Sequence, residues 1–307
     1  MTSATWQPDA TPRPSSKPAT IDFYSKKLKH LLEYEPLAKR KLDGIDEKLI
    51  DAYKQKRART ISRYGRLLSP GSINRELATL RRLLRLAWKW KLIDRVPEIK
   101  LLRGERQRDF ILSREQEANY LAVAPPDLHD VAVLMLDTGM RIGEALSLRW
   151  EAVTLQPAPG ARNGYATVVS VASKNSKARN VPLTTRVVEM LRARSLTSGE
   201  LVFVRTGGRP LVATWLNERH RALRAKLKLT SDFVPHSFRH TFGTRLGEAG
   251  ADPFTIMKLM GHSSVVVSQR YVHPTPETLE LAVERMAALN VQSGVTNALE
   301  SPQISPQ

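Results

Sequence analysis

The stretch YATVVSVASKNSKARNVPL, residues 165–183, decides which fold class the sequence predicts. It contains two β-rich runs, at 165–172 and 178–183, and the polar segment SKNSK joins them. Two such runs with a short polar connection are typical of a β-hairpin. Much of the remaining chain shows the three- and four-residue spacing of apolar residues that indicates helices. The sequence therefore predicts a mainly α protein with a small antiparallel β-sheet.

Upstream of this hairpin, residues 20–95 are predicted to form helices. We expect Ser72 to be the N-cap of the clearest helix. Apolar residues at helical spacing predict the buried stripe of this helix: Ile73, Leu77, Leu80, Leu84 and Trp88. Its other faces are rich in arginine, so the helix can lie along phosphate groups while its stripe packs on neighbouring helices.

Positive charge is concentrated in the N-terminal third of the chain. The 307 residues carry a formal net charge of +18. Up to Arg108 there are 26 Lys and Arg against 12 Asp and Glu, whereas the rest of the chain holds 22 against 18. A protein that is merely soluble and basic would spread its charge evenly. The asymmetry therefore favours a polyanion clamp, and nucleic acid is the expected partner.

The composition excludes several other classes of protein. The chain has no cysteine, which excludes disulfides and thiolate metal sites. The most prominent apolar run, 131–136, is too short to span a bilayer. The first residues lack the apolar core of a signal peptide. We therefore expect a cytoplasmic protein with no membrane partner.

Pro97 and the charged segment after it mark a boundary between two domains. After Leu289 the sequence turns polar and reads as disordered. We predict this order of segments: a flexible leader (1–19), a helical core DNA-binding domain (20–100), a linker (101–110), a mixed α/β catalytic domain (111–275), a C-terminal helix (276–290) and a disordered tail (291–307).

Four stretches of the second domain hold the side chains that metal-free cleavage of a phosphodiester needs. Arg141 and Arg239 can each hold phosphate oxygens in forked hydrogen bonds. The phenol of Tyr271 can attack phosphorus once a neighbouring group accepts its proton. The stretches are DTGMRIGEALSLRW (137–150), SKNSK (173–177), PHSFRHTFGTRL (235–246) and GHSSVVVSQRYVH (261–273).

The remaining candidates supply protons or complete the pocket. Lys174 at the hairpin tip can protonate a departing alkoxide, although Lys177 on the same hairpin is an alternative. His236 lies three residues before Arg239 and hence on the same helical face. His262 lies nine residues before the tyrosine.

Taken singly, these residues have ordinary structural alternatives. Glu144 can orient the guanidinium of Arg141, and this pair could be purely structural. Tyr271 could be a packed ring. His236 and His240 could bind zinc, but no third ligand stands near them in the sequence. The combination of all these residues in one order favours phosphodiester chemistry.

The combination resembles the tyrosine recombinase family, the phage-type integrases, in its two-domain form. The resemblance covers about residues 20–275, more loosely in the N-terminal part, and is most specific in GHSSVVVSQRYVH. It implies a helical core-binding domain and a mixed α/β catalytic domain that close around duplex DNA in a C shape. It also implies residue roles: Arg141 and Arg239 clamp the phosphate, Lys174 is the general acid, His236 and His262 are pocket histidines and Tyr271 is the nucleophile.

By the same resemblance, the protein is an enzyme that cleaves and rejoins double-stranded DNA at specific recombination sites. A covalent 3′-phosphotyrosyl intermediate would allow integration or excision of a mobile element without metal, cofactor or ATP. The implied assembly is a homotetramer on two sites, with DNA-bending accessory proteins left open. The helix at 276–290 would dock on a neighbouring protomer or on its own domain through one stripe: Leu279, Val283, Met286 and Leu289. Two alternatives remain open, namely type IB topoisomerase-like DNA relaxation and a catalytically inert DNA-binding regulator.

Overall fold

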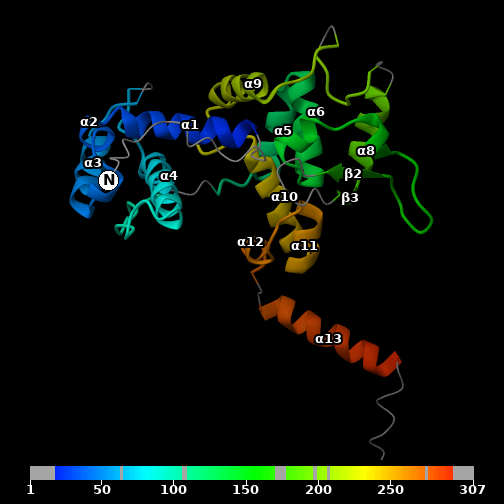
Figure 1. The fold of residues 1–307 in the computed structure, drawn as a ribbon. Coiled ribbons are helices and arrows are strands. Elements are labelled where there is room, and N and C mark those ends of the chain that lie inside the picture. The colour runs from blue at the N-terminus through cyan, green and yellow to red at the C-terminus, as the bar shows by residue number, and fades with distance from the viewer. Residues whose placement is uncertain are drawn as a thin grey trace, which may run out of the picture. The chain divides into compact units, whose positions relative to one another are not determined.

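Helices make up most of the protein, as the sequence predicts (Figure 1). The structure is a computed structural model, and it describes residues 18–62, 65–105, 109–169, 178–195, 199–205, 208–273 and 276–292. The chain divides into two compact units, Met1–Gln107 and Arg108–Gln307, and each has its own apolar core. No helix in these described ranges is long and apolar enough to cross a membrane.

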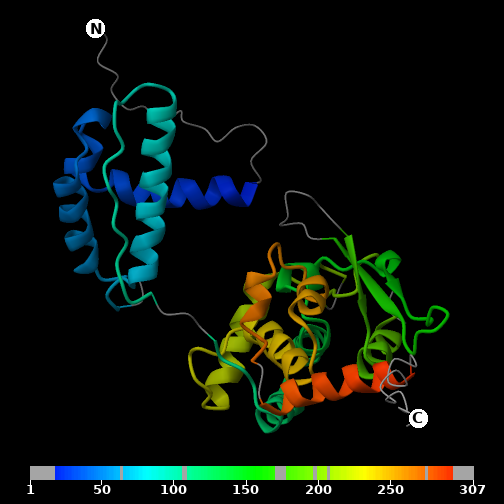
Figure 2. The ribbon, with the colours of Figure 1, turned by 90° about the horizontal axis from the view of Figure 1, so that it is seen from below.

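The first unit is built entirely from helices and loops in its described residues (Figure 2). The long helix α4 packs against α1, and both contribute to the core. The core side chains of α4 include Ile73, Leu77, Leu80 and Leu84, all of them predicted. The elements are α1 (Pro18–Leu32), α2 (Glu35–Ala38), the 3-10 helix η1 (Leu42–Gly44), α3 (Glu47–Ala58) and α4 (Pro70–Lys89).

Two details of the prediction for α4 are wrong. The N-cap is Ser69, whose side chain accepts a hydrogen bond from the Ser72 backbone N–H, because Pro70 is well suited to the first helical position. Trp88 is 55% exposed, and Ala87 takes its place in the core. The buried stripe advances by alternating steps of four and three residues, so the step after Leu84 falls on position 87.

A three-stranded antiparallel sheet lies in the second unit, in the order β1-β2-β3. The strands are β1 (Val153–Thr154), β2 (Tyr165–Val169) and β3 (Ala178–Pro182). Tyr165 pairs with Pro182 and Val169 with Ala178, which confirms the predicted antiparallel pairing of the two runs. The two-residue strand β1 was not predicted. The hairpin tip lies outside the described residues.

Helix α6 forms the centre of the second unit (Figure 1). Its run 131–136 is fully enclosed by other elements, and α6 contacts α5, α7, α8, α9 and α10. The helices of this unit are α5 (Arg114–Val123), α6 (Pro126–Thr138), α7 (Ile142–Leu146), the 3-10 helix η2 (Trp150–Ala152), α8 (Thr185–Arg194), α9 (Ala213–Lys226), α10 (His236–Glu248), α11 (Pro253–Met260), α12 (Val266–Gln269) and α13 (Pro276–Gln292).

The ends of the described chain differ slightly from the predicted bounds. Helix α1 begins at Pro18, inside the predicted leader, and α13 continues to Gln292, two residues past its predicted end. The predicted leader before residue 18 and the predicted tail after residue 292 lie outside the described residues.

Candidate active site

Tyr271 packs against one face of α10. His236, His240, Gly243 and Gly247 follow one another in steps of four, three and four residues, so they share a face of this helix. A Cβ added to Gly243 would lie 2.8 Å from Cζ of Tyr271, and one added to Gly247 would lie 1.8 Å from its carbonyl oxygen. No side chain fits at either position, so both glycines are needed for this close approach.

Tyr271 is buried against this helix face, with only 7% of its surface exposed. Its ring packs on Ile256 and Met260 of α11, and its hydroxyl lies 2.9 Å from Nδ1 of His240. The ring of His262 lies nearly parallel to the tyrosine ring, with centroids 6.2 Å apart. Burial raises the pKa of the Tyr271 hydroxyl, although the positive charges of Arg270 and Arg239 partly oppose this.

Arg239 is a buried cation on the same helix, with 2% of its surface exposed. Its guanidinium donates a hydrogen bond to the backbone carbonyl of Gly139. Burial, together with the nearby positive charge of Arg141, lowers the pKa of Arg239 to about 9. Among the described residues, no carboxylate forms an ion pair with it. Because a buried charge without a counterion is costly, the site favours binding of an anion.

Arg141 lies at the start of α7, as predicted, and Glu144 orients it. Nη1 of Arg141 donates to Oε1 of Glu144 over 2.9 Å, and its backbone N–H donates to Oε2 over the same distance. Nη2 donates to the carbonyl of Gly261 over 3.0 Å. This confirms that Glu144 orients the guanidinium, and it fixes Arg141 beside the turn that carries His262.

Arg179 on β3 is a site residue that the sequence reasoning missed. Its Nη2 and Nη1 donate to the two carboxylate oxygens of Glu144 over 2.7 and 3.2 Å, and Nε donates to the carbonyl of Leu259 over 2.9 Å. Although burial raises the pKa of Glu144, the hydrogen bonds from Arg179 and from the Arg141 backbone bring it below its ordinary value. Strand alternation could have revealed Arg179, since it faces inward together with Val181.

The arginine cluster, defined as Arg141, Arg179 and Arg239, therefore has an excess of positive charge. Two of its members share the single carboxylate of Glu144, and the third has no carboxylate partner in the described part of the chain. Guanidinium groups bind phosphate oxygens through paired hydrogen bonds. This arrangement can hold a phosphate group and stabilise negative charge that develops on it.

Three histidines around Tyr271 are held in the neutral form. Burial and the charges of Arg239 and Arg141 lower the pKa of His262 to about 4. Burial and the charge of Arg270 lower that of His240. Partial burial and the neighbouring His240 also lower the pKa of His236, whose side chain still reaches solvent. Neutral imidazoles can accept protons at neutral pH.

The structure thus brings five of the six predicted site residues into one region. Arg141, His236, Arg239, His262 and Tyr271 lie around the N-terminal half of α10, where their charges influence one another's pKa. The sixth, Lys174, and its alternative Lys177 lie outside the described residues. The sequence suggests His240 only as an alternative zinc ligand, whereas the structure places it against the tyrosine hydroxyl.

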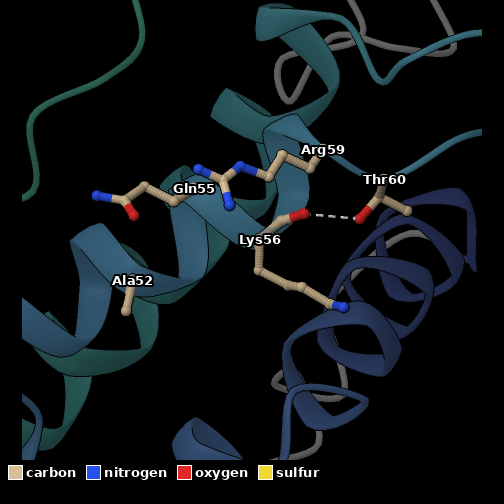
Figure 3. Close-up of a pocket in the computed structure, with 5 residues that line it drawn as sticks. All are labelled: Ala52, Gln55, Lys56, Arg59 and Thr60. Atoms are coloured by element: carbon tan, nitrogen blue, oxygen red, sulfur yellow. Dashed lines mark hydrogen bonds between the residues drawn. The ribbon is translucent and has the colours of Figure 1, made fainter.

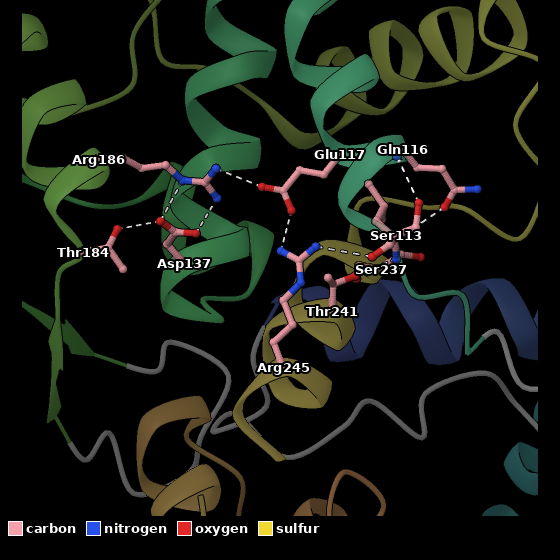
Figure 4. Close-up of polar contacts among 10 residues, drawn as sticks. Ser113, Gln116, Glu117, Asp137, Thr184, Arg186, Ser237, Thr241 and Arg245 are labelled. Carbon is pink, nitrogen blue, oxygen red and sulfur yellow. Dashed lines mark hydrogen bonds and ion pairs between the residues drawn. The ribbon is translucent and has the colours of Figure 1, made fainter. Parts of the chain in front are cut away.

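A polar network around the buried Glu117 holds α10 in place (Figure 4). Glu117 of α5 accepts hydrogen bonds from Arg245 of α10 and from Arg186 of α8, the second over 2.9 Å. Arg186 also pairs with Asp137 of α6. The network therefore ties α10 to three other helices and makes the helix a rigid base for the site.

The segment before Tyr271 is attached to the start of the second unit. The side chain of Arg270 donates a hydrogen bond to Asp109, and its guanidinium carbon lies 5.8 Å from the centre of the tyrosine ring. This ion pair places one positive and one negative charge beside the hydroxyl of Tyr271.

A second feature of functional interest is a basic groove along α3 in the first unit (Figure 3). It has a volume of about 510 Å³ and is lined by Ala52, Gln55, Lys56, Arg59 and Thr60. The helix is anchored by Arg57, which pairs with the buried Glu76 over 2.7 Å. The exposed side chains are therefore presented on a fixed backbone.

A buried tyrosine packed against α10 beside the arginine cluster, in a mainly helical fold with a small antiparallel sheet, fits a tyrosine recombinase, an enzyme that cleaves and rejoins DNA. The chain belongs to the phage integrase family, whose model matches residues 114–278, more than half of its length.

Relatives of known class agree with this assignment. Tyrosine recombinase XerC of Pediococcus pentosaceus is 28% identical over 238 residues, which cover 71% of this chain and 76% of the relative. XerC of Bacillus subtilis is 28% identical over 258 residues, covering 78% and 81%. XerD of Corynebacterium glutamicum is 35% identical over 167 residues, covering 50% and 51%.

Solved structures show the same fold. The Tn1549 transposon integrase in complex with a circular intermediate DNA matches with a TM-score of 0.72 and 21% identity, covering 89% of this chain and 95% of that one. The XerH site-specific recombinase bound to difH substrate matches with a TM-score of 0.64 and 20% identity, covering 86% and 78%.

Proposed function

We propose that the protein integrates or excises a mobile DNA element through a covalent 3′-phosphotyrosyl intermediate. The observation that carries the chemical part is the charge excess of the arginine cluster next to a buried tyrosine. A scissile phosphodiester supplies the missing anion. The mobile element is supported by membership of the phage integrase family and by a fold like that of a transposon integrase bound to circular intermediate DNA.

The chemical step follows from the roles that these groups can take. Arg239 and Arg141 hold the non-bridging oxygens, while the hydroxyl oxygen of Tyr271 attacks phosphorus. The departing 5′ oxygen receives a proton from Lys174, the proposed general acid, and His236 and His262 complete the pocket. The phosphotyrosyl ester conserves the energy of the broken bond, so the strand can be resealed without ATP.

Within this proposal, the first unit binds duplex DNA. The basic groove on α3 presents Lys56 and Arg59, which suit phosphate oxygens, together with Gln55. Gln and Arg are also the side chains that read adenine and guanine edges through paired hydrogen bonds. We assign the segments 20–100 and 111–275 to DNA binding and catalysis, respectively, with 101–110 as the linker.

The proposed assembly is a homotetramer on two DNA sites, in which α13 docks on a neighbouring subunit. Leu279, Val283 and Met286 of this helix are 59%, 61% and 56% exposed in the single chain. Exposed apolar residues on one helix are typical of a contact surface. Packing of α13 on its own unit is the competing arrangement, and the truncation described in the Discussion separates the two.

The proposal is tested on duplexes tiled across the DNA that flanks the coding region. Those that bind are made into nicked suicide substrates and incubated with the protein, and covalent adducts are separated on a denaturing gel. We expect an SDS-resistant adduct at the 3′ end of the cleaved strand, and recombination of plasmids that carry two copies of the same site. Relaxation of plasmids without such sites, with no recombination, would instead indicate a topoisomerase. Binding without any adduct would indicate a regulator.

A further inference from the structure

The hydroxyl of Tyr271 has a specific partner in His240. The distance between its oxygen and Nδ1 of His240 is 2.9 Å. No other hydrogen bond to this hydroxyl occurs among the described side chains. Both groups are positioned by the same helix, because His240 belongs to α10 and Tyr271 rests on Gly243 and Gly247 of that helix. Their separation is therefore set by one rigid element.

The surroundings of His240 favour its neutral form, which can accept a hydrogen bond. Burial disfavours the charged imidazolium, and so do the positive charges of Arg270 and Arg239, whereas Asp109 alone favours it. On its own helix His240 also faces the ring of His236, edge to face at 4.7 Å. A neutral imidazole with its proton on Nε2 accepts through Nδ1. In that tautomer the hydroxyl of Tyr271 donates the hydrogen bond, and its proton points at an acceptor.

We propose that His240 is a catalytic residue that accepts the hydroxyl proton of Tyr271 during strand cleavage and returns it during resealing. As the bond between the tyrosine oxygen and phosphorus forms, the bond from phosphorus to the 5′ oxygen breaks. The phenolic proton moves to Nδ1 of His240, and the 5′ oxygen takes a proton from the general acid. Resealing reverses each transfer. This inference rests on the proposed function and adds the identity of the proton acceptor.

The other two histidines of the pocket are less suited to this role. Nδ1 of His262 is already engaged with Oγ of Ser268 at 2.7 Å. The ring of His262 lies flat beside the tyrosine ring and forms no hydrogen bond with its hydroxyl. His236 contacts His240 rather than the tyrosine. It can receive the proton only through a further group.

The test is the pH dependence of single-turnover cleavage on a nicked suicide duplex. His240→Asn keeps an acceptor atom near the position of Nδ1 but cannot take up the proton, whereas His240→Ala removes both. For wild-type protein we expect a rate that levels off above the lowered pKa of His240. For His240→Asn we expect a loss of about 10²- to 10⁴-fold at neutral pH, the usual range for a general base, and a rate that keeps rising toward alkaline pH. His129→Asn, at a partly exposed histidine paired with Asp130 on α6, is the matched control and should keep the wild-type profile.

A purely positioning role gives a different result. If His240→Asn retains the wild-type pH profile, whether or not the rate falls uniformly, His240 is not the proton acceptor. A substrate with a 5′-phosphorothiolate leaving group should not restore the His240 variants, because they lack the base and not the acid. Restoration would overturn the assignment. If His240→Ala lowers the melting temperature, imidazole is added to the folded fraction to replace the missing base. If neither imidazole nor alkaline buffer raises the cleavage rate of this variant, the result counts against the proposal.

Two variants separate the role of His240 from the proposed function. If wild-type protein forms an adduct that Tyr271→Phe abolishes, while His240→Asn behaves like wild type, only the role of His240 is lost. If Tyr271→Phe still forms the adduct, the tyrosine is not the nucleophile and the proposed function itself fails.

Discussion

Each unit of the protein buries a tyrosine next to charged groups, but the two tyrosines have opposite surroundings. In the first unit, the hydroxyl of Tyr53 donates to the carboxylate of Glu76 over 2.7 Å, and Arg57 donates two further hydrogen bonds to that carboxylate. The negative charge of Glu76 is therefore balanced by the positive charge of Arg57. Burial and the negative charge of Glu76 raise the pKa of Tyr53 far above its ordinary value.

In the second unit, the hydroxyl of Tyr271 faces a neutral histidine and positive charge. The arginine cluster contains three guanidiniums for the one carboxylate of Glu144. An ion pair that serves only the fold is balanced, because unpaired buried charge costs stability. The imbalance around Tyr271 therefore fits the anion site proposed above, whereas the balance around Tyr53 is that of a structural ion pair.

The largest expected difference concerns the two hydroxyl groups. Tyr271→Phe removes the attacking oxygen but keeps the ring, so covalent adducts should vanish while DNA binding is retained. Tyr53→Phe should leave adduct formation intact and lower the free energy of unfolding by about 1–3 kcal/mol, because Glu76 loses a buried hydrogen bond. Denaturing gels of adducts on a suicide duplex and urea unfolding curves measure both effects. An adduct formed by the Tyr271 variant would contradict the comparison.

The second difference concerns the arginines. Arg239→Ala and Arg141→Ala should each slow cleavage by about 10²- to 10³-fold, the loss typical of one missing oxyanion donor. Arg57→Ala should instead cost about 3–5 kcal/mol of stability, since it leaves the buried carboxylate of Glu76 unpaired. Rapid-quench cleavage rates and thermal melts distinguish the two kinds of loss. A catalytic defect in Arg57→Ala at temperatures where it is folded would show that the first unit also takes part in chemistry.

A smaller effect is expected for α13. A chain that ends at Pro274 should bind one DNA site nearly as well as the full chain, because the basic groove and the arginine cluster remain. Formation of the two-site complex should weaken by about tenfold or more, since each apolar side chain of α13 that is buried in an interface contributes roughly 1.5–3 kcal/mol. Gel-shift titrations with one and two sites provide the measurement, with Leu279→Ser as a milder variant. A truncated chain that melts much lower and binds one site poorly would show that α13 packs on its own unit.

The smallest effect concerns the pH dependence of stability. Burial lowers the pKa of His220, which hydrogen-bonds Tyr120 and the carbonyl of Phe233, and it also lowers the pKa values of the three histidines around Tyr271, with that of His262 at about 4. Because these values lie below 6.5 in the folded chain, unfolding takes up protons in this range, and stability falls as the pH drops from about 6.5 toward 4. We expect the melting temperature to fall by a few degrees, which corresponds to a loss of about 1 kcal/mol in the free energy of unfolding.

Calorimetry in buffers across that range measures this pH effect. His220→Gln should reduce the acid-induced fall in melting temperature, at the cost of a lower value at neutral pH. His30→Gln, at a partly exposed histidine of the first unit, is the control and should leave the curve unchanged. A fall of equal size in wild-type protein and in His220→Gln would show that other groups cause it.

The sequence predicted those parts of the molecule that depend on local spacing. The pairing of β2 with β3, the position of Arg141 before α7, and the placement of His236 and Arg239 on α10 follow from periods of two and 3.6 residues. The buried stripe of α4 was predicted correctly up to Leu84. Its last member was wrong because the next step along the stripe is three residues, to Ala87, and not four residues, to Trp88. Strand β1 is too short to produce a pattern.

The contacts that sequence reasoning missed join residues far apart in the chain. Arg179 meets Glu144 across 35 positions, and His240 meets Tyr271 across 31. Neither residue type is unusual in its own stretch, since an arginine in an edge strand and a histidine in a basic helix are ordinary surface residues. Strand alternation places Arg179 on the inward face, but the partners of both residues depend on how β3 and the segment after α12 pack against the rest of the unit.

The glycine face of α10 has a consequence for how the site moves. Gly247 lies against the backbone of Tyr271, and His240 is carried by the same helix less than two turns away. We therefore expect any displacement of α10 to be shared by both residues, so that the hydroxyl oxygen of Tyr271 and Nδ1 of His240 shift together and the distance between them hardly changes. The two atoms between which a proton must pass keep their spacing even while the remainder of the pocket adjusts around a bound strand.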